Sequence, residues 1–152
     1  MPHVLAMEKE NSILLPEFRR LLETGHQVQF TPKGVSMRPY IEGGRDSVIV
    51  ERPNRSLRTG DIVLAKINDT YVLHRIAHCN GGQLVLHGDG NLCGSEYCSR
   101  KDILGIVTMI LRNGSRPVHP TRAIIWRHLP VVARKYGLKI YRKCLRWHRN
   151  YN

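Results

Sequence analysis

The sequence contains no hydrophobic run long enough to cross a membrane. A spanning helix needs about 18 consecutive apolar residues, and no such run occurs in the 152 residues. Residues 1–10 carry charges where a secretory signal has an apolar stretch. We therefore expect a cytoplasmic protein, peripheral to the inner membrane surface at most. Its four cysteines are then expected to be free thiols rather than a disulfide framework.

Acidic residues are missing from the last quarter of the chain. Residues 114–152 contain ten Lys and Arg and no Asp or Glu, whereas residues 1–113 contain 14 Lys and Arg against 12 acids. The main part of the chain is therefore nearly neutral, and the net charge of +12 belongs mostly to the tail. A basic segment of this kind favours an anionic partner. We expect a membrane surface in preference to nucleic acid.

Hydrophobic residues make up 41% of the chain, which is enough for one packed core. Residues 12–24 place apolar side chains at helical spacing and predict a short amphipathic helix. The period then changes to two, and short strands are predicted between breaks rich in Gly, Asn, Asp and Pro. These strands cover residues 28–30, 47–50, 62–67, 71–76, 83–87 and 103–111. We expect a mainly β fold, with coiled antiparallel sheets or a small barrel.

The tail predicts two further helices, over residues 121–129 and 131–149, with a break at Gly137. Apolar and basic residues of the second helix fall on different faces, so this segment is a basic amphipathic helix. The expected organisation is a helical segment over 1–26, a β domain over 27–113 and the basic tail over 114–152.

Three residues from separate segments supply the chemistry of a serine hydrolase. A serine hydroxyl needs a base within hydrogen-bond reach to act as a nucleophile, and histidine is suited to that role. A carboxylate can then fix the tautomer of the imidazole. Ser36, His74 and Asp89 have these three chemical types. Gly34 allows a close backbone approach of a substrate or an oxyanion.

Four short motifs in order give these residues a context. They are Gly-Val-Ser-Met-Arg-Pro at 34–39, Gly-Asp-Ile-Val at 60–63, Val-Leu-His-Arg-Ile at 72–76 and Gly-Asp-Gly-Asn at 88–91. Together they resemble the superfamily of serine peptidases that includes type I signal peptidases and LexA-type repressors. The resemblance covers about residues 27–113. The His74-Arg75 pair replaces the Lys-Arg pair of bacterial signal peptidases and is similar to the archaeal and endoplasmic-reticulum type, which uses histidine.

The resemblance implies coiled β-sheets with a small barrel and an active site along an open groove. It also implies that the substrate is a peptide or protein precursor bound as an extended strand. Gly34, Met37 and Pro39 would lie at the oxyanion and substrate site, and Asp61 and Arg75 would be structural. The chain is expected to depart from signal peptidases, because residues 1–35 contain no apolar span that could serve as a membrane anchor before the serine. It also has Gly34 at the position where a serine often donates to the oxyanion.

Several alternatives remain open at this stage. Lys66 is another candidate base, and Cys93 with Cys98 has the loose spacing of a zinc pair, although we expect no metal and no cofactor. A self-cleaving repressor is disfavoured because residues 1–35 contain no Ala-Gly or Cys-Gly bond. The alternative from a different class is a non-catalytic basic binding module, with the same β scaffold and a tail that binds membrane or nucleic acid.

Overall fold

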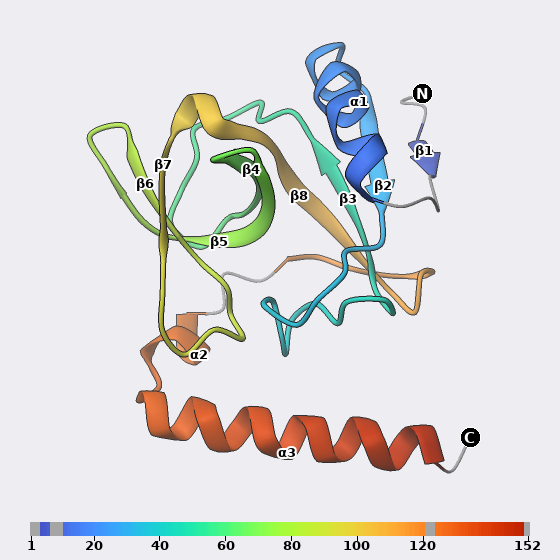
Figure 1. Ribbon diagram of the computed structural model, residues 1–152, viewed down its shortest axis with the longest axis vertical. Coiled ribbons are helices and arrows are strands. Elements are labelled where there is room, and N and C mark those ends of the chain that lie inside the picture. Colours follow the sequence, from blue (N-terminus) through green and yellow to red (C-terminus); the bar gives the residue numbers. More distant parts are fainter. Residues whose placement is uncertain (1–3, 7–10, 121–123, 151–152) are drawn as a thin grey trace.

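The computed structural model describes residues 4–6, 11–120 and 124–150. Strands dominate the first three quarters of the chain, and helices follow (Figure 1). In chain order the elements are β1 (Val4–Ala6), α1 (Asn11–Glu23), β2 (Gln27–Phe30), β3 (Ser47–Glu51), β4 (Ile62–Ile67), β5 (Thr70–Asn80), β6 (Gln83–His87), β7 (Glu96–Ser99), the 3₁₀ turn η1 (Arg100–Asp102), β8 (Ile103–Arg112), β9 (Arg116–Val118), α2 (Ile124–His128) and α3 (Val131–Asn150).

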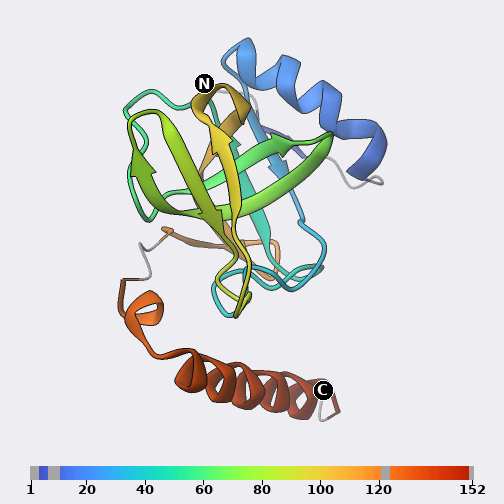
Figure 2. The same cartoon turned by 60° about the vertical axis from the view of Figure 1, so that its left-hand side comes forward.

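The strands form one curled sheet in the order β1-β2-β3-β8-β4-β5-β6-β7, with β9 paired to β8. All pairs are antiparallel except β1 with β2. The sheet bends round on itself at β4 to β7, as Figures 1 and 2 show from two sides. The predicted mainly β fold, with a short helix near the N-terminus and a helical C-terminal segment, is confirmed.

The β4–β5 hairpin follows directly from the local sequence. Asn68 and Asp69 have φ angles of 46° and 62°. Two residues with positive φ form the turn whose twist matches that of paired strands, and Asn and Asp tolerate this conformation better than most residues. The turn fixes the register of β4 and β5, so that His74 lies opposite Val63.

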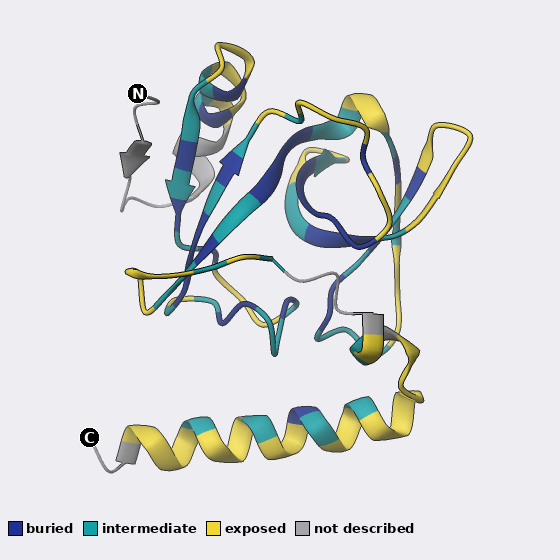
Figure 3. Ribbon diagram, turned by 180° about the vertical axis from the view of Figure 1, so that it is seen from behind, coloured by how far each residue is buried: buried dark blue, intermediate teal, exposed yellow. Residues whose placement is uncertain are grey.

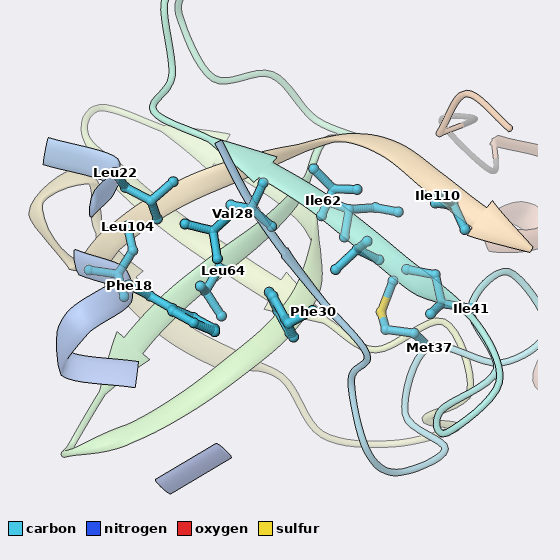
Figure 4. Close-up of a cluster of buried hydrophobic side chains, with 13 residues drawn as sticks. Phe18, Leu22, Val28, Phe30, Met37, Ile41, Ile62, Leu64, Leu104 and Ile110 are labelled. Atoms are coloured by element: carbon cyan, nitrogen blue, oxygen red, sulfur yellow. The ribbon is translucent and has the colours of Figure 1, made fainter. Parts of the chain in front are cut away.

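The main core lies between the sheet, α1 and the loop that joins β2 to β3 (Figure 4). Phe18 and Leu22 of α1 are both 1% exposed, and the ring of Phe18 lies 5.3 Å from that of Phe30. The β2–β3 loop contributes Met37 and Ile41 to the same core. The residue directly after Ser36 is thus anchored in the interior.

The C-terminal segment packs along one side of this body (Figure 1). The predicted break at Gly137 is wrong, because α3 runs through it without interruption. The glycine instead makes room for a neighbour, since a Cβ there would lie 3.1 Å from the ring of Trp126. Among the described residues, no helix is both long and apolar enough to span a membrane.

Candidate active site

Ser36 lies in the loop between β2 and β3, which is held in a series of tight turns. Within this loop the Arg38 N–H donates to the Val35 carbonyl at 3.2 Å, and the Ile41 N–H donates to the Met37 carbonyl at 3.0 Å. Gly34 adopts a φ of +95°, a conformation that favours glycine. The hydroxyl of Ser36 is therefore carried by a rigid backbone and is itself half-buried.

The Gly-Asp-Gly-Asn motif packs directly against this loop. The Gly90 N–H donates to the Ser36 carbonyl at 2.7 Å. A Cβ on Gly88 would lie 2.5 Å from the Ser36 carbonyl oxygen, and one on Gly90 would lie 2.6 Å from that of Val35. Both glycines are needed for close backbone approach, so this motif forms a support for the loop that carries Ser36.

His74 projects from β5 and is 6% exposed. Its Nδ1 lies 2.9 Å from Oε2 of Glu96, at the start of β7. An ionised carboxylate can only accept hydrogen bonds, so this contact holds the imidazole proton on Nδ1. The lone pair of Nε2 is then available to accept a proton from another group.

Ser36 and His74 line the same pocket, which has a volume of about 150 Å³. One wall comes from residues 32–43 of the β2–β3 loop and the other from residues 71–74 of β5. The pocket is smaller than typical ligand cavities of about 300–1,000 Å³. Its volume is on the scale of one amino-acid side chain.

The surroundings of Ser36 also contain donors for a negative oxygen. Among the described residues, the backbone N–H groups of Ser36 and Met37 donate no hydrogen bond within the protein. The side chain of Ser36 likewise makes no hydrogen bond to His74 in this structure. Gly34 and Met37 line the pocket, whereas Pro39 lies in the same loop outside the pocket wall.

Asp89 has a different partner from the one that the sequence predicts. We expected Asp89 to orient His74, but its two carboxylate oxygens accept hydrogen bonds from Nε and Nη2 of Arg75 at 2.7–3.1 Å. Arg75 and Asp89 are 1% and 3% exposed. The carboxylate beside the imidazole is that of Glu96.

The Arg75–Asp89 pair also connects the Gly-Asp-Ile-Val motif at residues 60–63 to the site. Nη1 of Arg75 donates to the Gly60 carbonyl at 2.8 Å. The next residue, Asp61, accepts the Arg58 N–H at 2.9 Å and the guanidinium of Arg55 at 2.8 and 2.9 Å. The four sequence motifs thus meet in one hydrogen-bonded network, in which Ser36 and His74 face the pocket and the charged residues hold the frame.

The far end of the Ser36 loop is fixed by a second buried carboxylate. Asp46 is 0% exposed and accepts hydrogen bonds from the Glu42 N–H at 2.9 Å and from Arg112 of β8 at 2.6 Å. Burial alone would raise the pKa of Asp46, but these hydrogen bonds and those from Arg45 lower it to about 2. Asp46 therefore stays ionised and ties the loop to the sheet.

The other candidates from the sequence are engaged elsewhere. Nζ of Lys66 lies 2.8 Å from Asp69 at the β4–β5 turn, and this carboxylate raises the pKa of Lys66, which opposes a role as base. Cys98 is buried, and burial raises the pKa of its thiol to about 11, whereas Cys93 is exposed. The described residues contain no cluster of three or more His, Cys, Asp or Glu that could hold a metal ion.

Glu96 is the site residue that the sequence interpretation missed. It stands at the start of β7, a four-residue strand that was not predicted. The sequence offers only a weak signal for its role, because Glu96 is simply the acidic residue that begins a short stretch after the turn at Gly94. Glu96 reaches His74 only because β5, β6 and β7 curl together, and this arrangement is not a local property of the sequence.

Comparison with known protein families agrees with the fold and the motifs. A search of curated proteins found no match. The Peptidase S24-like family matches residues 9–108, about two thirds of the chain, including α1 and most of β8. These residues carry all four motifs and Glu96. The chain therefore belongs to the Peptidase S24-like family.

Proposed function

We propose that this chain is a serine endopeptidase in which Ser36 is the nucleophile and His74 the general base. The observation that carries the proposal is the shared pocket of Ser36 and His74, together with the Nδ1 contact to Glu96. Catalytic hydrogen bonds are often long in unliganded enzymes and tighten when substrate binds. The proposed enzyme is thus a histidine-base peptidase in which Glu96, rather than Asp89, orients the imidazole of His74.

The geometry supports a two-step acyl transfer. Ser36 Oγ attacks the scissile carbonyl carbon while Nε2 of His74 takes the hydroxyl proton. The backbone N–H groups of Ser36 and Met37 stabilise the oxyanion. His74 then gives its proton to the leaving amine, and a water, activated by the same imidazole, hydrolyses the acyl-enzyme. Glu96 stabilises the imidazolium formed in each half of the reaction.

The edge of β5 supports binding of the substrate as an extended strand. Residues 71–74 pair on one side with β4, and pairing with β6 on the other side begins only at Arg75. Within the described part of the chain, no strand pairs with this second edge of residues 71–74. A free edge beside the pocket is a template for strand addition. The pocket would then take one small side chain of the peptide next to the scissile bond.

The test is cleavage of a mixed peptide library, with products read by mass spectrometry. We expect Ser36→Ala and His74→Ala each to reduce cleavage by about 10⁴-fold or more, as for other activated serines. The matched controls are Ser115→Ala, which changes an exposed serine between β8 and β9, and His78→Ala, which changes an exposed histidine of β5, the strand that also carries His74. Loss of cleavage in the site variants with unchanged melting temperatures supports the assignment.

Two outcomes would remove the proposal. Undiminished cleavage in Ser36→Ala would show that the activity comes from another group. Cleavage of no peptide by the wild-type chain, together with no reaction of Ser36 with an activated ester, would leave the non-catalytic binding module.

A further inference from the structure

The exposed apolar side chains of this molecule are concentrated in its C-terminal helices. Nine large hydrophobic residues are exposed among the described side chains, and seven of them lie on α2, α3 and the turn between them. The seven are Ile125, Leu129, Val131, Val132, Tyr136, Ile140 and Trp147, with exposures of 38–82%. Figure 3 shows α3 as mostly exposed, with a narrow band of buried and intermediate residues on the side that faces the body. Such a concentration marks an interaction surface.

Four of these residues form a stripe along one side of α3. Val132, Tyr136, Ile140 and Trp147, here called the apolar stripe, are separated by four, four and seven residues. Such spacings place side chains on one helical face. The stripe lies opposite Leu138, which is 3% exposed and packs toward the body. The stripe is therefore 60–65% exposed on the side of α3 that faces away from the body.

Cationic residues flank the apolar stripe, and the helix has no acid to balance them. At about 100° per residue, Lys135, Lys139 and Lys143 fall on or beside one edge of the stripe. The remaining charged residues of α3 are Arg134, Arg142, Arg146 and Arg149. An anionic partner with an apolar layer beneath its charges would satisfy both parts of this surface.

The apolar stripe and its flanking cations together favour one class of partner over the others. Nucleic acid would neutralise the cations but leave four large apolar side chains in water. A second copy would cover the stripe but bring two strongly cationic helices together, which costs electrostatic energy. A bilayer surface takes apolar side chains at the headgroup–acyl boundary and cations at the phosphates. We propose that α3 docks the protein on an anionic bilayer surface through the apolar stripe and the three flanking lysines.

Docking in this orientation would hold the pocket near the bilayer. The body-facing side of α3 contacts the loop that carries Ser36: Arg38 lines a cavity of about 250 Å³ with Arg142, Arg146 and Arg149. Nε1 of Trp126 in α2 donates to the Asp89 carbonyl at 2.9 Å, which ties the helices to the support of that loop. If the proposed function holds, the substrates are peptides presented at the membrane. The docking itself does not depend on catalysis.

The test is co-sedimentation of the full chain with lipid vesicles. We expect binding to vesicles of phosphatidylcholine mixed with phosphatidylglycerol, little binding to phosphatidylcholine alone, and weakening by salt. Ile140→Ser with Trp147→Ser should lower the partition coefficient by about tenfold or more, because two large side chains no longer insert. The matched control is Tyr97→Ser, which removes an exposed aromatic side chain from β7.

The charge arm uses Lys139→Glu with Lys143→Glu. About 1 kcal/mol per charge near an anionic surface corresponds to about fivefold per charge lost, so this pair should lower binding by at least about tenfold. Lys101→Glu, an exposed lysine of the body, should change binding by less than about twofold. Equal melting temperatures keep the comparison independent of folding.

Three results would overturn the proposal. The first is equal sedimentation of wild type and stripe variants. The second is salt-dependent binding to duplex DNA with no binding to anionic vesicles. The third is a dimer in solution that the stripe variants convert to monomer. Each is read without any assay of proteolysis, so failure of docking and failure of the proposed function remain distinguishable.

Discussion

His74 and Arg75 are neighbours on β5, and each meets a carboxylate, but they belong to two different regions of the molecule. His74 lies at the pocket wall, and its partner Glu96 has a side chain that is 33% exposed. Arg75 lies in the interior, where the side chains of Arg75 and Asp89 are 1% and 2% exposed. The alternation of side chains along a strand separates the two regions by one residue.

The two pairs differ in burial, and we expect them to differ in role, with His74 and Glu96 in proton transfer and Arg75 and Asp89 in support of the fold. A charge pair out of water is stable only when its hydrogen bonds are satisfied, and Arg75 meets this condition with Asp89 and the Gly60 carbonyl. An imidazole at the edge of a pocket, with one nitrogen held and the other available, is able to gain and lose a proton.

The largest effect on stability is expected from breaking the interior pair. Asp89→Asn or Arg75→Met should each lower the free energy of unfolding by about 3–5 kcal/mol, because one charge is left buried without its partner. The double variant Arg75→Met with Asp89→Leu should be more stable than either single variant. Urea unfolding checks both expectations.

The exposed Arg20–Glu17 pair on α1 provides the control. Arg20→Met removes a side chain that is 73% exposed from Glu17, whose side chain is 42% exposed, and should lower the free energy of unfolding far less than Arg75→Met does. Equal losses for Arg20→Met and Arg75→Met would contradict the distinction between a surface pair and the buried frame.

At the pocket, the same kind of change should affect catalysis rather than folding. Glu96→Gln should lower kcat on a cleaved peptide by about a hundredfold, because the amide fails to stabilise the imidazolium. The melting temperature should stay close to that of wild type, since this pair is part-exposed. Glu17→Gln, on the outer side of α1, is the matched control. Unchanged kcat in Glu96→Gln would leave Ser36 and His74 as a dyad without an orienting acid.

A smaller effect is expected at Asp46, the anchor at the far end of the loop. Its pKa is lowered from 3.8 to about 2 in the folded state, so its stabilising contribution is present above about pH 4 and is lost as the pH falls toward 2. A shift of this size corresponds to about 2 kcal/mol. Urea unfolding between pH 6 and about pH 2 should show this loss in wild type and a shallower one in Asp46→Asn. Identical pH profiles would exclude Asp46 as an anchor.

Much of this arrangement could be predicted from the sequence because it depends on local patterns. The strand over 62–67 and the turn at Asn68-Asp69 follow from alternation and from residues that tolerate positive φ. The mainly β fold and the family resemblance followed from the same strands and motifs.

Features that depend on contacts between distant parts of the chain could not be predicted from local sequence patterns. Gly137 looks like a helix break until the ring of Trp126 is seen against it. The carboxylates of Glu96 and Asp89 are chemically equivalent in the sequence. The curl of β5, β6 and β7 brings Glu96 next to His74, and the interior position of Arg75 pairs it with Asp89.

The account depends most on a Ser36 hydroxyl activated by His74, and covalent labelling tests this directly. A serine-directed fluorophosphonate should modify the wild-type chain at Ser36, with the oxygen–phosphorus bond formed and fluoride released, as located by peptide mass spectrometry. The rate should fall by about a hundredfold or more in His74→Ala and stay unchanged in His78→Ala. Modification of a different residue, or the same rate at Ser36 without the imidazole, would contradict the proposed activation.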